Sequence, residues 1–227
     1  MAEPVISVDI ERLSDACPFL NPRVSFELKP GELLWLRGPS GAGKSFCCMH
    51  ISGLATLPGA AVKVRWDAGV PTAQRVGFLF QKGVLIDSLN LAENIALALR
   101  ASGEPFPSSE IVRTLEAVGL SGTMDGPKMP GQLSGGMLRR AALAQILAQR
   151  KRLIILDEPF VGLDPPVAVE VVKLIRSVAS SRSIAMILVS HLEPLATQLG
   201  PARHLHLERA RAEVTTGAIR THANDCI

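Results

Sequence analysis

A glycine-rich segment at residues 38–45 has the residue types and spacing needed to bind phosphate. It consists of Gly38, Pro39, Ser40, Gly41, Ala42, Gly43, Lys44 and Ser45, which fits G-x-x-x-x-G-K-[ST]. Glycines let successive backbone N–H groups turn towards an anion without Cβ clashes. Lys44 can reach the β- and γ-phosphates of a nucleotide, and the Ser45 hydroxyl can ligate Mg²⁺. The segment therefore predicts a nucleotide site.

Two adjacent carboxylates form a second candidate group. Residues 153–156 are all apolar, and Asp157 and Glu158 follow them directly. A fully apolar strand is typical of the centre of a parallel sheet, and it would carry both carboxylates to the sheet edge beside the phosphate loop. There Asp157 can hold Mg²⁺ through water, and Glu158 can orient or deprotonate an attacking water.

The predicted elements place these groups in an α/β chain. Alternation and apolar runs predict strands at 5–10, 24–28, 32–37, 76–80, 153–156 and 184–190. Helical spacing predicts helices at 89–101, 111–118 and 167–179, another from Ser134 as N-cap through Leu147, and one after Ser45 that ends near Gly59. We expect a short β-rich segment and a polar tail to follow the last of these strands. We expect one domain over 1–227, with a core at about 1–81 and 149–227 and a helical subdomain at about 82–148.

Composition limits the class of protein and its partners. The chain has 227 residues, 47% of them hydrophobic, and its 24 basic against 21 acidic residues give a net charge of +3. This charge is too small to indicate nucleic acid as a partner, and the apolar content excludes disorder. Four cysteines are too few for a disulfide framework, so we expect Cys17, Cys47 and Cys48 to be small buried hydrophobes. The uncharged run at 45–62 is interrupted by polar residues and Pro58, and no signal peptide is recognisable, which predicts a cytoplasmic chain.

Further motifs appear in a fixed order, and together they carry a family resemblance. Leu133, Ser134, Gly135, Gly136 and Met137 resemble the signature sequence of ATP-binding cassette (ABC) proteins. Gln81 resembles the family's Q-loop glutamine, residues 162–164 its D-loop, and His191 its switch histidine. The chain thus resembles an ABC nucleotide-binding domain over nearly its whole length. This implies a P-loop NTPase fold: a RecA-like core with a mainly parallel sheet, an inserted α-helical subdomain and an N-terminal antiparallel β subdomain.

The resemblance also implies the ligands, the site residues and an oligomeric state. ATP would bind residues 38–45 with Phe46, Gln81 and Asp157, and Mg²⁺ would be held by Ser45, Gln81 and, through water, Asp157. Glu158 and His191 would be catalytic, with His191 holding Glu158 and the attacking water in line. Two cassettes would dimerise head to tail, most simply as a homodimer. The residues that would bind ATP in trans are Leu133, Ser134, Gly135, Gly136, Met137 and Asp164.

Three longer segments indicate a branch of the family. LSGGMLRRAALA (133–144), DEPFVGLDP (157–165) and residues 78–100 resemble the ATPase subunits of Mce/Mla-type phospholipid transporters. This implies an integral membrane permease, an Mce-domain lipid-binding protein and a peripheral position on the cytoplasmic face of the inner membrane. Residues 89–101 would leave an apolar groove for a permease helix, touched by some of Val84, Leu85, Ile86 and Leu89.

The sequence departs from the family pattern, and alternatives stay open. Many family members have Gln where this chain has Met137. The chain has no tyrosine, and Phe19 is the nearest upstream candidate for stacking on adenine. A cassette that serves another substrate, or a non-transport process such as cell division, is the main alternative. A regulator that binds nucleotide without turnover is a third, which Glu158 and His191 oppose.

Overall fold

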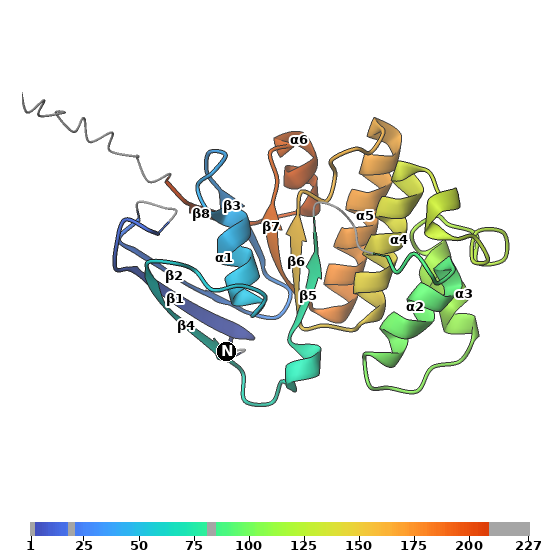
Figure 1. Ribbon diagram of the computed structural model, residues 1–227, viewed down its shortest axis with the longest axis horizontal. Helices are drawn as coiled ribbons and strands as arrows, with labels where there is room; N and C mark the ends of the chain where they lie inside the picture. Colours follow the sequence, from blue (N-terminus) through green and yellow to red (C-terminus); the bar gives the residue numbers. More distant parts are fainter. Residues whose placement is uncertain (1–2, 18–20, 81–84, 209–227) are drawn as a thin grey trace, which may run out of the picture.

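Two β-sheets organise the computed structural model, which describes residues 3–17, 21–80 and 85–208 (Figure 1). The first sheet is antiparallel, with the order β2-β1-β4. The second is parallel, with the order β5-β6-β7-β3-β8. The strands are β1 (Ile6–Arg12), β2 (Arg23–Leu28), β3 (Leu33–Arg37), β4 (Ala60–Trp66), β5 (Val76–Leu79), β6 (Leu153–Asp157), β7 (Ala185–Val189) and β8 (Arg203–His206).

The parallel sheet is central because its strands β6 and β7 are apolar at every position except Asp157, the last residue of β6. Every residue of β6 and β7 is buried, and their register pairs Ile155 with Ile187. Since all neighbouring strands run in the same direction, their carboxyl ends share one edge. At this edge β3 leads into the glycine-rich loop and β6 ends at Asp157.

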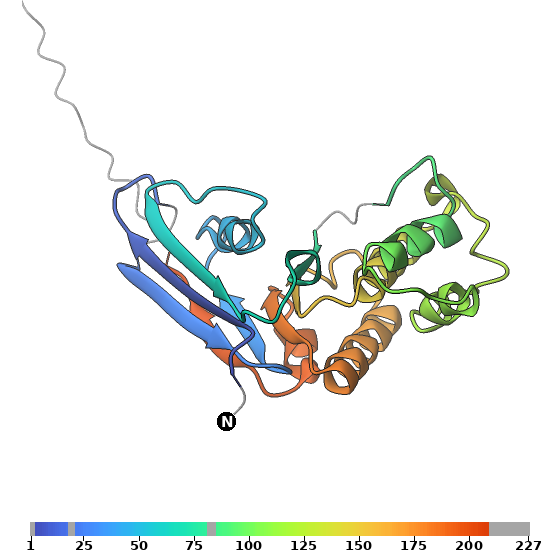
Figure 2. The ribbon, with the colours of Figure 1, turned by 90° about the horizontal axis from the view of Figure 1, so that it is seen from below.

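Helices cover both faces of this sheet (Figure 2). On one face α1 (Lys44–Ile51) packs in a core shared with the antiparallel sheet, and Cys17, Cys47 and Cys48 are buried there, as predicted. On the other face α4 (Gly135–Ala148) and α5 (Pro165–Arg182) pack against Ile154 and Leu156. The short helices are η1 (Thr72–Gln74), η2 (Pro130–Gln132), α6 (Glu193–Ala196) and η3 (Thr197–Leu199).

A helical region lies at the end of the molecule away from the antiparallel sheet (Figure 1). There α2 (Leu91–Arg100) and α3 (Ser109–Glu116) form a third apolar core with one side of α4. A capping box between Asn90 and Glu93 starts α2, and the Asn94 side chain binds the backbone of Ile86. Because α4 contributes to two cores, the division of the chain near residues 82 and 149 stays a prediction.

The predicted length of the helix after Ser45 was wrong. Helix α1 ends at Ile51 rather than near Gly59. Gly53 has φ +76°, and its N–H and that of Leu54 bind the carbonyls of His50 and Met49, which closes the helix. The chain then forms β4, which the sequence analysis did not predict, although apolar and charged residues alternate from Val62 to Trp66.

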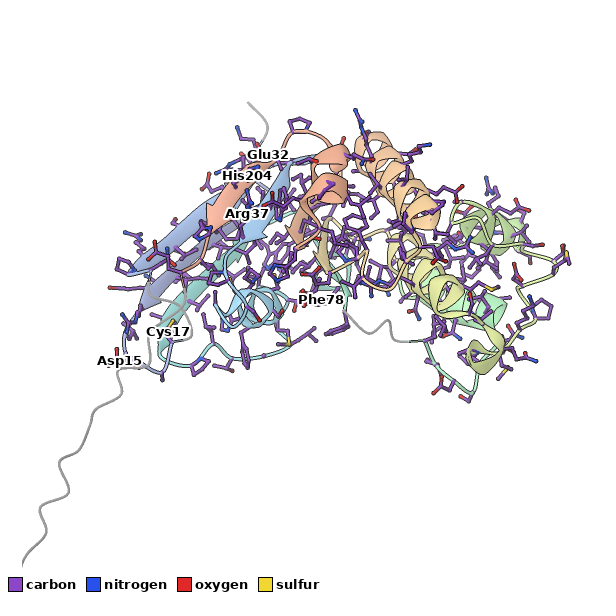
Figure 3. The ribbon with its side chains drawn as sticks, turned by 90° about the horizontal axis from the view of Figure 1, so that it is seen from above. Asp15, Cys17, Glu32, Arg37, Phe78 and His204 are labelled. Carbon is purple, nitrogen blue, oxygen red and sulfur yellow. The ribbon has the colours of Figure 1, made fainter. Side chains whose placement is uncertain are left out.

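Other predictions from the sequence are confirmed. The α/β fold class holds, with its parallel sheet and separate antiparallel sheet. Ser134 is the N-cap of α4, and its hydroxyl accepts a hydrogen bond from the Met137 N–H at 3.3 Å. The expected β-rich end is β8, which carries His204 (Figure 3). The His204 ring packs on Trp35 with a centroid distance of 5.3 Å. Within the described ranges, no helix is both long and apolar enough to span a lipid bilayer.

Candidate nucleotide site

The glycine-rich loop forms the floor of an open cavity at the carboxyl edge of the parallel sheet. Gly41 and Gly43 have φ +76° and +83°, conformations that glycine adopts without steric cost. They wrap the loop around the N-terminus of α1, whose free N–H groups attract anions. The cavity has a volume of about 600 Å³. Its lining consists of Ser40, Gly41, Gly43, Lys44, Ser45, Phe46, Asp157, Glu158, Val161, Val189, His191 and Leu192.

Lys44 is held in place by the loop itself. Its Nζ donates hydrogen bonds to the carbonyls of Gly38 and Pro39, both at 2.8 Å. Burial lowers the pKa of Lys44, and the carboxylates of Glu158 and Asp157 oppose that shift. The ammonium group is thus fixed at the cavity before any phosphate arrives, which reduces the entropy that binding would cost.

Asp157 and Ser45 bring two oxygen ligands together. Burial raises the pKa of Asp157, while a hydrogen bond with Ser45 and the nearby charges of Arg139 and Lys44 lower it. Hydroxyl and carboxylate oxygens are ligands that Mg²⁺ accepts, so this pair fits that ion. The described residues contain no cluster of three or more His, Cys, Asp or Glu side chains able to hold a metal. Besides Ser45 and Asp157, the expected ligand Gln81 falls outside the described residues, and water and substrate phosphates would supply the other ligands of a magnesium ion here.

Glu158 and His191 face one another across the same cavity. The Glu158 side chain is buried, and its Oε2 accepts a hydrogen bond from the His191 backbone N–H at 3.4 Å. Its Oε1 lies 3.6 Å from His191 Nε2 and has no hydrogen-bond partner among the described residues. A buried acceptor without a donor is costly, so the surrounding structure must hold it in place. Glu158, His191 and Lys44 line one cavity, where they can together hold and polarise a water.

The residues expected to bind the ATP of a second cassette in trans do not line this cavity. The signature residues surround the N-terminus of α4, and Asp164 is the N-cap of α5. Leu133 is buried in the helical core. The backbone at Gly135 is open, since a Cβ there would meet nothing within 4 Å. Gln81 and Phe19 fall outside the described residues.

Two exposed apolar side chains of the cavity, besides the buried Val189, were missed by the sequence analysis. Val161 and Leu192 line it, with exposed fractions of 45% and 40%, beside the predicted residue Phe46 at 48%. The three side chains line one cavity, and exposed apolar residues gathered in one place can mark an interaction site. Their signal in the sequence was weak: each is a single apolar residue next to the D-loop or the switch histidine.

The family description "ABC transporter" matches residues 22–161, which is more than half of the chain. This chain belongs to the ABC transporter family, and it is a cassette ATPase. It is 36% identical over 189 residues to the "Intermembrane phospholipid transport system ATP-binding protein MlaF" of Escherichia coli (strain K12), covering 78% of this chain and 69% of MlaF.

Other relatives carry other names. The cassette is 37% identical over 171 residues to the "Thiamine import ATP-binding protein ThiQ" of Yersinia pestis, covering 72% of this chain and 71% of ThiQ. The solved structure of the ATP-binding cassette MJ0796, a dimer in "a post-hydrolysis state" with ADP and Pi, superposes with a TM-score of 0.71. That match covers 90% of this chain and 97% of the other at 23% identity, so it supports the fold.

Proposed function

We propose that this cassette is the ATPase subunit of a membrane transporter of the Mce/Mla type, which moves phospholipid between bacterial membranes. The observation that carries the proposal is the similarity to MlaF, the phospholipid-transport ATP-binding protein. The stretches 133–144 and 157–165, already noted for their likeness to this branch, support it. In this role ATP hydrolysis would drive a conformational change in other chains.

In the proposed hydrolysis, the residues that line the cavity bind ATP and activate a water molecule. The loop amides and Lys44 bind the β- and γ-phosphates of ATP. Glu158 takes a proton from the water that attacks the γ-phosphorus, and His191 holds that water and Glu158 in line. Mg²⁺, held by Ser45, Gln81 and, through water, Asp157, would neutralise charge on the phosphate oxygens.

We further propose that the catalytic unit is a head-to-tail homodimer. The signature residues lie away from the cavity of their own chain, yet Ser134 and the amides of Gly135 and Gly136 are arranged at a helix start to bind an anion. In a head-to-tail pair they would face the γ-phosphate bound by the other chain. Phe46, Val161 and Leu192 would then be covered by the partner, which accounts for their exposure in one chain.

A permease is the second proposed partner, and it would hold the cassette at the cytoplasmic face of the inner membrane. Near the end of β5 and in the helical region, apolar side chains reach the surface. Of the residues expected to contact a permease helix, Ile86 is exposed and Leu85 and Leu89 are half-buried, whereas Val84 falls outside the described residues. An Mce-domain lipid-binding protein would complete the assembly.

The similarity to ThiQ favours a second candidate, a cassette that serves a permease for another substrate. The two proposals differ in the chains that accompany this one. Tagged cassette can be extracted from its host in mild detergent, and the proteins and lipids that copurify can be identified by mass spectrometry. A permease with an Mce-domain protein and phospholipid is the expected result. A permease with a different binding protein and no lipid would support the second candidate, and the absence of any membrane protein would refute both.

A further inference from the structure

Arg139, in the second turn of α4, has an unusual environment for a cation. The residue is 6% exposed, and among the described residues its guanidinium group donates hydrogen bonds to the backbone carbonyls of four. Nε binds Pro159 at 3.1 Å, Nη1 binds Phe80 at 2.6 Å, and Nη2 binds Asp157 at 3.1 Å and Glu158 at 2.5 Å. Burying a guanidinium group costs free energy unless its donors are satisfied, and these carbonyls satisfy them.

These carbonyls belong to the segments that present the reacting groups. Three of them follow one another from Asp157 to Pro159, where β6 ends and the chain turns. The fourth, at Phe80, directly follows β5. A planar guanidinium group with donors in fixed directions can bind several carbonyls at once, whereas an ammonium group acts as a point charge. Arg139 thus joins α4 to the turn that carries Glu158.

The backbone of Glu158 needs such support. Its φ is +51°, in the left-handed region that non-glycine residues rarely adopt. Holding a residue in this conformation costs about 1–3 kcal/mol, and it persists where the surroundings fix it. The conformation directs the Glu158 side chain towards His191, where its Oε1 is left without a donor. The Arg139 hydrogen bond to the Glu158 carbonyl is one contact that fixes it.

We propose that Arg139 is a positioning residue for hydrolysis: it holds the Glu158 turn in its left-handed conformation and thereby keeps the carboxylate aligned with the attacking water. This inference rests on the proposed role of Glu158 as the base. Loss of the guanidinium group should leave ATP bound by the loop and Lys44, so it should lower kcat and change KM little. Small displacements of a reacting group can cost about 10²-fold in rate.

The test is a double-mutant cycle on the full chain. Arg139→Met removes every donor, and we expect kcat to fall about 10²-fold while the Kd for ATP changes less than about threefold. In the Glu158→Gln background, the same substitution should lower the residual turnover less than about twofold, because the group that Arg139 positions is already gone. The matched control is Arg140→Met: this neighbour binds the carbonyls of Val118 and Gly119, away from the cavity, and turnover should be retained.

The outcomes distinguish a failure of the proposed role of Arg139 from a failure of the proposed role of Glu158. An equal fractional loss in both backgrounds, or a loss matched by Arg140→Met, would overturn the positioning role and make Arg139 a general structural residue. If Glu158→Gln alone keeps wild-type turnover, the proposed role of Glu158 fails instead. Should Arg139→Met not fold, Arg139→Gln retains an amide donor and enters the same cycle. For Arg139→Gln we expect a smaller fall in kcat, of about 10-fold, and only in the background that retains Glu158.

Discussion

Replacing Gly38 with alanine tests the close contact between the start of the phosphate loop and the last strand. A Cβ at Gly38 would lie 2.2 Å from the Leu207 carbonyl oxygen, and the φ of Gly38 is +142°. Carbon and carbonyl oxygen approach to about 3.3 Å in proteins, so one side must move by about 1 Å. The Leu207 N–H is bound to the Arg37 carbonyl at 2.8 Å, and a retreat of that size would break this hydrogen bond.

The expected loss of stability combines two costs. The positive φ costs alanine about 1–3 kcal/mol. The broken backbone hydrogen bond costs a further net 0.5–1.5 kcal/mol, roughly. Together they lower the free energy of unfolding by about 1.5–4.5 kcal/mol, measurable by urea titration followed by circular dichroism.

Gly53→Ala is the matched control. Gly53 also has a positive φ, +76°, but a Cβ there would meet nothing within 4 Å. This variant should lose only the free energy that a positive φ costs alanine, about 1–3 kcal/mol, without the further loss of a hydrogen bond. If Gly38→Ala is no less stable than Gly53→Ala, β8 does not lie against the phosphate loop as the structure has it, and the reasoning is refuted.

Three further predictions concern the reaction. Glu158→Gln should bind ATP and accumulate as a closed dimer while losing about 10²–10⁴-fold in turnover, because the general base is removed; gel filtration showing a monomer in ATP with turnover retained would contradict this. Lys44→Ala should weaken ATP binding itself, measured by calorimetry, since the ammonium fixed at the cavity is lost; unchanged affinity would mean that the loop does not hold the phosphates. Ser134→Arg should abolish hydrolysis while the monomer keeps its ATP affinity; mixed dimers with wild type that lose neither site would exclude the trans arrangement.

Much of the fold was predictable because its signals are local. The apolar runs of β6 and β7 and the strand before the phosphate loop can be identified by eye, and Ser134 caps a helix as its position suggests. The strand β4 was missed although its alternation of apolar and charged residues is a local signal, whereas its pairing with β1, a segment distant in the chain, is not recorded in the local sequence. The end of α1 was misplaced since a single left-handed glycine, Gly53, outweighed the apolar residues that follow it.

The sequence by itself determined which residues form the candidate site: Lys44, Ser45, Asp157, Glu158 and His191 were predicted, and the structure lines one cavity with all five. It could do so because each residue lies at or just after the end of a strand, or in the first turn of the helix that follows the glycine-rich loop, where local sequence fixes its position.

Only the tertiary structure decided how this chemistry is supported. Three features depend on contacts between segments far apart in the chain. They are the left-handed backbone of Glu158, its Oε1 without a hydrogen-bond partner among the described residues, and the carbonyls to which Arg139 donates hydrogen bonds. Such contacts exist only after packing brings α4 against the ends of β5 and β6, so no local pattern in the sequence records them.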